Sequence, residues 1–171
     1  INNPGLLTCS VSQLTLNAIP SSGASLQWST TNGNILSGST SASPVVNAPG
    51  TYSLLVTNVS NGCTNSSSVQ VVQEQNIPTG FDFDLTPPNC LGVLGIVQFN
   101  QVLGGIGPYL YSVNNGQNFQ SLASFNNLNP GNYTLVIQDV NGCEIETPLN
   151  VPEPPKPAVD LIPTFTIQLG E

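Results

Sequence analysis

The chain of 171 residues contains no histidine and no methionine, and its single basic residue is Lys156. Because histidine and Cys-x-x-Cys pairs are both missing, the usual ligand sets for zinc are excluded. A formal net charge of −8 gives the chain nothing with which to bind a phosphate backbone, so nucleic acid is not expected as a partner. No apolar run approaches the roughly 18 residues of a membrane-spanning helix, and we expect no direct membrane insertion.

The acid and base groups needed for catalysis are also scarce, since charged residues make up 6% of the chain. Asp82 and Asp84, or Glu144 and Glu146, stand two residues apart and would share one face of a strand, as a glycosidase pair might. Two carboxylates adjacent on a short strand are more often solvated surface. We therefore predict that the chain is not an enzyme and has no catalytic residues.

The chain does contain an internal repeat. A Pro-Gly-x-Tyr motif begins at Pro49 and again at Pro130, and an Asn-Gly-Cys motif begins at Asn61 and again at Asn141. The two offsets are 81 (130 − 49) and 80 (141 − 61) positions. A repeat of this length is a small domain rather than a solenoid unit. We predict two tandem domains, at residues 1–75 and 76–154.

Each copy carries two cysteines, Cys9 and Cys63 in the first and Cys90 and Cys143 in the second. Four cysteines allow three pairings. The pairing that treats the copies alike joins Cys9 to Cys63 and Cys90 to Cys143, and each bridge would contribute roughly 4 kcal/mol in the chain-entropy model. The alternative is four buried thiols. Disulfides in small β-rich units indicate an oxidising compartment, and hence export from the cell.

Hydrophobic residues recur with a period of two almost throughout the chain. Leu26 and Trp28 alternate with polar neighbours, and so do Tyr52, Leu54 and Val56. Turn signals rich in Gly, Pro, Asn and Ser separate these runs. The pattern predicts an all-β fold: two tandem immunoglobulin-like β-sandwich domains, each with one disulfide, followed by a C-terminal proline-rich linker and a lone strand.

The aromatic residues have structural and functional interpretations. Tyr52 and Tyr133 follow the Pro-Gly turns, and we expect each to bury its ring while its hydroxyl binds a nearby backbone group. Trp28 is expected in the core. Tyr109 and Tyr111 share one strand face, and the competing interpretation exposes them as an aromatic platform. Such a platform would bind surface glycans and make the chain a carbohydrate-binding accessory module.

Three carboxylates are weak candidates for calcium, because hard oxygen ligands suit that ion and a bound ion would stiffen a domain junction. They are Asp82, Asp84 and Asp139. The run Asp139-x-Asn141-Gly142 is equally what a hairpin turn requires for backbone reasons. We expect no cofactor, with calcium as the alternative.

Residues 155–171 begin with a proline-rich spacer, which favours a stiff polyproline II conformation. Beyond it, four apolar residues share one parity and predict a strand without a domain: Leu161, Phe165, Ile167 and Leu169. This strand either opens a further repeat or, through residues 161–169, completes the sheet of another copy as a donor strand. The second alternative describes a self-assembling extracellular filament subunit.

Residues 87–154 resemble the repeat of SprB-type gliding and adhesion proteins of Bacteroidetes. Five motifs carry the resemblance in order: Cys90-x-Gly92, Gly104-Gly105-x-Gly107-Pro108-Tyr109-x-Tyr111-Ser112, Asn115-Gly116, Leu128-x-Pro130-Gly131-Asn132-Tyr133 and Asp139-x-Asn141-Gly142-Cys143. The first copy resembles the immunoglobulin-like or PKD-like repeats of the same large surface proteins. Its motifs are Cys9, Leu14-x-Leu16, Gln27-Trp28-Ser29-Thr30, Gly50-x-Tyr52 and Asn61-Gly62-Cys63.

The resemblance implies a long, secreted protein of the bacterial cell surface, exported by the type IX system, with roles in adhesion, gliding motility or the extracellular matrix. The leading functional hypothesis is a non-catalytic structural or adhesive segment, a stalk or fibre of tandem β-sandwich repeats. Its partners would be neighbouring repeats of the same protein or other copies of itself.

Deleting residues 158–171 tests the donor-strand alternative. If these residues complete a neighbour's sheet, the deletion abolishes polymers while each domain stays folded, because the donated main-chain hydrogen bonds are lost. Size-exclusion chromatography with circular dichroism checks both properties. Unchanged assembly after the deletion would instead favour the opening strand of a further repeat.

Overall fold

The computed structural model describes residues 4–156, and the regular secondary structure in that range is entirely β. Since residues 4–156 form no helix, they contain none long and apolar enough to cross a membrane. The predicted all-β class is confirmed. The lone strand predicted around Leu161, Phe165, Ile167 and Leu169 lies outside the described residues.

The first group of strands comprises β1 (Leu6–Leu7), β2 (Leu14–Thr15), β3 (Ala24–Thr30), β4 (Ile35–Ser37), β5 (Val45–Val46), β6 (Gly50–Asn58) and β7 (Thr64–Gln73). They form a four-stranded sheet in the order β1-β7-β6-β3 and a three-stranded sheet in the order β2-β5-β4. Strand β1 runs parallel to β7, and the other neighbours are antiparallel.

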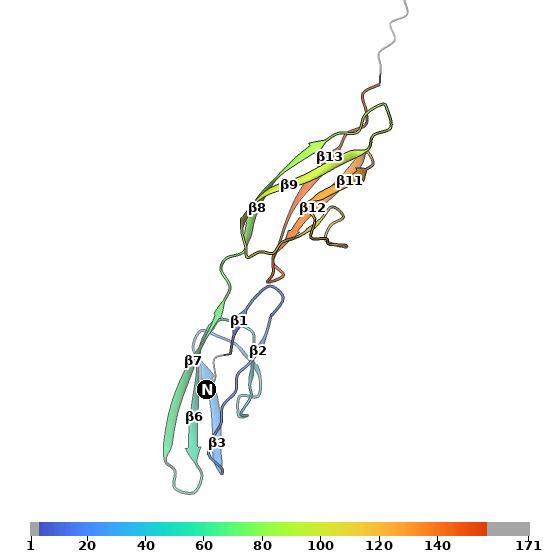
Figure 1. Cartoon of the computed structure of the whole chain (residues 1–171). Helices are drawn as coiled ribbons and strands as arrows, with labels where there is room; N and C mark the ends of the chain where they lie inside the picture. The colour runs from blue at the N-terminus through green and yellow to red at the C-terminus, as the bar shows by residue number, and fades with distance from the viewer. Residues whose placement is uncertain (1–3, 157–171) are drawn as a thin grey trace, which may run out of the picture.

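The second group comprises β8 (Pro78–Thr86), β9 (Gly95–Gly104), β10 (Leu110–Ser112), β11 (Ser124–Leu128), β12 (Gly131–Gln138) and β13 (Glu144–Val151). Two three-stranded antiparallel sheets result, in the orders β10-β12-β13 and β11-β9-β8. Figure 1 shows the two groups following one another along an elongated molecule.

Each group has its own hydrophobic core, made of side chains from both of its sheets. The first core contains Leu7, Leu16, Trp28, Val46, Tyr52, Leu54 and Val71. The second contains Val97, Phe99, Leu128, Leu135, Ile137, Leu149 and Val151. Side chains that alternate along each strand place every second residue in these cores. The domain boundaries drawn at residues 75 and 154 stay a prediction.

The doubled Pro-Gly-x-Tyr motif starts an equivalent strand in each group, β6 and β12. Gly50 has φ of 156° and Gly131 has φ of 151°, a region that side chains disfavour. In both copies the tyrosine hydroxyl donates to the carbonyl four residues earlier, at 2.7 Å for Tyr52 and 3.0 Å for Tyr133. Tyr52 is fully buried, and its hydroxyl also accepts a hydrogen bond from the Asn34 N–H at 2.8 Å.

The predicted cysteine pairing is wrong for the first copy. Cys9 is bonded to Cys143, 134 positions away, and not to Cys63, which is free and exposed. Cys9 lies just beyond Leu7, which pairs with Gln73 at the end of β7, whereas Cys63 precedes the start of that strand. Ten residues of β-strand span about 33 Å. A disulfide requires Cα atoms within about 7 Å, so Cys9 and Cys63 cannot meet.

The second predicted pair, Cys90 with Cys143, is wrong for the same reason. Cys143 immediately precedes β13, while the thiol of Cys90 lies beyond the far end of that strand and donates to the Pro155 carbonyl at 3.1 Å. Cys90 is therefore free and exposed. The structure has one disulfide among its described residues, and it joins the two groups instead of stapling each one.

Replacing Tyr52 with Phe should destabilise the first core, since the change removes the buried hydroxyl that makes part-buried hydrogen bonds with the Asn34 N–H and the Ala48 carbonyl. The expected cost is about 1–3 kcal/mol. Urea unfolding followed by the fluorescence of Trp28, the single tryptophan, reports on that core. Tyr133→Phe is the matched control: it removes one exposed hydrogen bond near the second core and should leave the Trp28 transition unchanged.

Candidate functional site

The junction between the two groups is the most distinctive site of the molecule. Two covalent connections cross it: the chain itself at residues 74–77, between β7 and β8, and the disulfide of Cys9 with Cys143. Figure 1 shows the loop between β1 and β2 meeting the turn between β12 and β13. The Cα atoms of the two cysteines are 5.0 Å apart. Two separate attachments restrict both bending and rotation, which one linker alone would allow.

Backbone contact accompanies the disulfide. The Ser10 N–H donates to the Asn141 carbonyl across the junction at 2.9 Å. A Cβ added to Gly142 would lie 2.9 Å from the Ser10 Cβ, closer than real side chains approach. The glycine of this Asn-Gly-Cys motif thus allows the two loops to touch, besides supplying the turn that its sequence predicts.

Asp139 organises the second group's side of the junction. It is 3% exposed, and its Oδ1 accepts hydrogen bonds from the backbone N–H groups of Asn141 and Cys143, both at 2.9 Å. Its Oδ2 accepts from the Ile106 N–H at 3.2 Å. The Val140 N–H donates to the Ile106 carbonyl at 2.9 Å. This single carboxylate therefore fixes the bridging cysteine and ties its turn to the loop that follows β9.

The same loop also contacts the linker. The Asn76 side chain donates to the Gly105 carbonyl at 3.1 Å. The Glu74 N–H donates to the Leu7 carbonyl at 2.9 Å, just before the loop that carries Cys9. Starting from the disulfide, the contacts run through Asp139 to the Gly105 loop, through the linker, and back to the Cys9 loop. The junction is a closed ring of covalent and hydrogen bonds.

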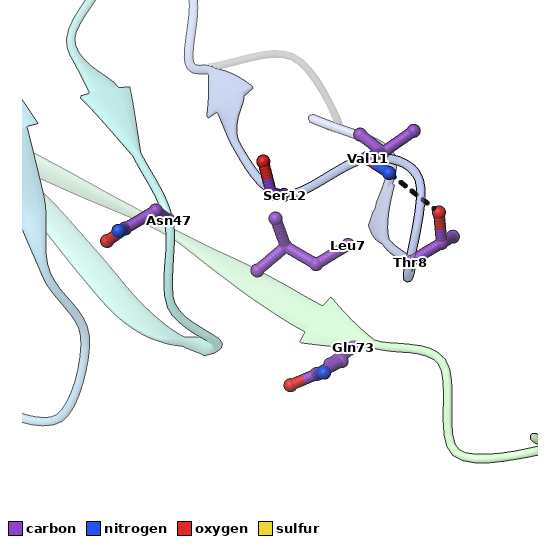
Figure 2. A pocket seen from close by; sticks show the side chains of 6 residues that line it. All are labelled: Leu7, Thr8, Val11, Ser12, Asn47 and Gln73. Carbon is purple, nitrogen blue, oxygen red and sulfur yellow. Dashed lines mark hydrogen bonds between the residues drawn. The ribbon is translucent and has the colours of Figure 1, made fainter. Parts of the chain in front are cut away.

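A small pocket lies beside the loop that carries Cys9. Its volume is about 190 Å³, whereas small-molecule sites usually enclose about 300–1,000 Å³. Figure 2 shows its six lining side chains, Leu7, Thr8, Val11, Ser12, Asn47 and Gln73. The Val11 N–H donates to the Thr8 Oγ1 at 3.0 Å (Figure 2). None of the six is charged, and the hollow follows from the shape of this loop.

The three calcium candidates do not come together. Asp82 and Asp84 are exposed on β8, where Asp84 accepts a hydrogen bond from Asn100 at 2.8 Å. Asp139 is buried at the junction, with both oxygens engaged by backbone N–H groups. Residues 4–156 contain no cluster of three or more His, Cys, Asp or Glu side chains suited to a metal. The expectation of no cofactor, with calcium as the alternative, stays a prediction.

The aromatic residues considered for glycan binding are largely part of the cores. Trp28 is 2% exposed and donates its Nε1–H to the Ser41 carbonyl at 2.9 Å. Tyr109 and Tyr111 are half-buried against the second core. The ring of Tyr111 lies 5.0 Å from that of Phe99. All three side chains therefore contribute to core packing, and glycan binding stays a prediction.

No protein-family model and no curated protein matches the chain. Among solved structures it is similar to a C-terminal 282-residue fragment of intimin, crystallised in complex with the intimin-binding domain of the translocated intimin receptor, Tir. The sequence identity is 14% and the TM-score 0.31, and the match covers 82% of this chain. The chain spans 56% of that fragment. A TM-score this low supports no inference about function.

Replacing Asp139 with Asn should loosen the junction. An amide offers one acceptor oxygen, so at least one backbone N–H of the Asp139 turn or of Ile106 would face a buried donor, at a cost of about 1–3 kcal/mol. Urea unfolding gives the total, and hydrogen exchange at the Ile106, Asn141 and Cys143 amides localises the effect. Asp84→Asn, on the exposed face of β8, is the control and should stay within about 0.5 kcal/mol of the parent. Equal stability of the two variants would contradict this role for Asp139.

Proposed function

We propose that this chain is a non-catalytic structural segment of an exported bacterial surface protein, a stiff spacer that carries load between the parts of that protein on either side of it. The observation that supports this proposal is the Cys9–Cys143 disulfide, whose covalent loop contains every buried residue of the two cores except Leu7, Leu149 and Val151. The adhesive or gliding role implied by the resemblance to SprB-type repeats belongs to the same proposal.

The position of the bridge gives it a mechanical role. Tension along the chain arrives at Cys9 from one side and at Cys143 from the other. The disulfide passes it directly between them, so most of the intervening strands are outside the load path. Because strands β2 to β12 all lie between the two cysteines, they stay folded under forces that would otherwise extend them. β1 and β13 lie outside the loop and bear the load first.

The bridge also contributes to stability at rest. In the chain-entropy model, closing a loop of 134 positions stabilises the folded state by about 5 kcal/mol. Residues 74–77 and the junction hydrogen bonds then hold the two cores in a fixed relation. A spacer needs such a relation because its function is to keep a distance.

Mechanical stretching of single molecules, with handles at the two ends of the chain, tests this proposal. In the oxidised protein, residues between Cys9 and Cys143 cannot contribute to the extended length. Reduction should therefore add about 440–480 Å, at 3.3–3.6 Å for each of 134 positions.

The Cys63→Ser/Cys90→Ser variant is the parent for this measurement, because reduction then acts on the Cys9–Cys143 bridge alone. Circular dichroism verifies that the reduced protein is still folded before it is stretched. An extension that is the same in the oxidised and reduced protein would refute the load-bearing role.

A further inference from the structure

The two unpaired cysteines lie at opposite ends of the molecule. Cys63 is in the turn between β6 and β7, at the end of the first group away from the junction, and Cys90 is in the connection between β8 and β9, at the far end of the second group (Figure 1). Both are exposed. We call Cys9 and Cys90 the early cysteines, and Cys63 and Cys143 the late cysteines, from their places in the two copies.

The loops of the two early cysteines are built alike. In the first, the Thr8 N–H donates to the Val11 carbonyl at 3.0 Å, and the Thr8 hydroxyl accepts from the Val11 N–H at 3.0 Å. In the second, the Asn89 N–H donates to the Val93 carbonyl at 3.0 Å, and the Asn89 Oδ1 accepts from the Val93 N–H at 3.3 Å. The residue before the cysteine thus makes the same two contacts with a valine in each copy, three residues later in the first loop and four residues later in the second.

The turns of the two late cysteines are equally alike. The Asn58 N–H donates to the carbonyl of the late cysteine at 2.9 Å, and the Gly62 N–H donates to the Asn58 carbonyl at 2.8 Å. In the second copy Asp139 and Gly142 make the corresponding contacts, at 2.9 and 3.0 Å, in a turn that is one residue shorter. The cysteine N–H donates to a side-chain oxygen of its own turn in both copies, that of Asn61 in the first and of Asp139 in the second. The two glycines have φ of 73° and 74°. Each turn then leads into the strand that ends its group, β7 or β13.

The disulfide in the structure joins an early loop to a late turn, across two successive groups. The remaining early loop and late turn are of the same two types, one at each end of the molecule. We propose that Cys90 of one copy of this chain and Cys63 of the next form this same bridge, which links copies head to tail. This proposal rests on the proposed spacer function, and it identifies a second copy of this chain as the partner of each free cysteine.

The surfaces around both thiols suit a contact between copies. Leu91, next to Cys90, is 90% exposed, and Val93 is 50% exposed. Val59, in the turn of Cys63, is 68% exposed. The loop or turn of each thiol therefore presents at least one exposed apolar side chain, and burial of these side chains would favour the contact. Because the two ends differ, one contact leaves a free early loop and a free late turn, and the association can repeat without closing.

The oxidation follows ordinary thiol–disulfide exchange. As the bond forms between the two Sγ atoms, the two thiols lose two protons and two electrons. A disulfide oxidant such as oxidised glutathione accepts the two protons and two electrons when its own S–S bond breaks to give two thiols. The protein needs an oxidising compartment and no other reagent.

Mixing two single-cysteine variants tests the head-to-tail pairing. Cys63→Ser keeps only the early thiol, and Cys90→Ser keeps only the late one. Each is incubated in a glutathione redox buffer, alone and as an equal mixture, and examined by non-reducing electrophoresis and intact mass. Glutathione in excess caps thiols that no specific contact holds together. We expect the parent to form a ladder of covalent oligomers, each variant alone to stay monomeric, and the mixture to stop at the dimer.

Peptide mapping of the mixed dimer should show the Cys63–Cys90 linkage with Cys9–Cys143 intact. The proposal is overturned if the parent stays monomeric, if either variant alone dimerises as readily as the mixture, or if the map shows Cys63 bonded to Cys9. The stretching experiment uses a variant that lacks both exposed thiols. The stretching experiment can therefore support the spacer function even if the mixing experiment rules out head-to-tail linkage.

Discussion

The Cys9–Cys143 disulfide is the constraint on which the rest of this molecule depends. Each hydrophobic core is complete within its own pair of sheets, so packing alone would leave two bodies joined by residues 74–77. The disulfide adds a second covalent connection between them. Around it, the Ser10–Asn141 hydrogen bond and the contacts of Asp139 turn two connections into a closed ring. A ring resists bending and twisting in a way that neither connection does by itself.

The cores explain why such a constraint is useful. Each contains few large buried side chains, and units of this size bury too small a fraction of their surface to be very stable on packing alone. Buried polar contacts add specificity: the Tyr52 hydroxyl bridges Asn34 and Ala48, and the Trp28 indole reaches Ser41. Cross-linking the groups lowers the entropy of the unfolded chain over a loop much longer than either group. One disulfide therefore stabilises both groups of strands.

Local physical rules were enough to predict the class of fold and several buried residues, because alternation and turn chemistry are local. Trp28 and Tyr52 lie in a core as their strand patterns require. Strand β7 carries little of this local signal, since all but two of its ten residues are exposed and its serine-rich start has no alternation. The cysteine pairing failed for a different reason. Repeat symmetry does not distinguish a bridge within each copy from a bridge between successive copies; the pairing depends on which ends of the strands the cysteine loops occupy.

Asp139 was considered as a metal ligand, and its role as an acceptor for three backbone N–H groups depends on Ile106, which is distant in sequence.

The ring makes the mechanical state of the chain depend on the redox state of its surroundings. In a reducing cytoplasm the thiols stay reduced, and the groups are then connected only by residues 74–77 and by hydrogen bonds that exchange with water. In an oxidising compartment the bridge closes, and the turn ordered by Asp139 holds Cys143 where Cys9 can reach it. The connection between the two groups is therefore looser in the reduced chain and stiffer in the oxidised one. The proposed spacer function depends on geometry and covalent continuity, so a charged content of 6% is compatible with it.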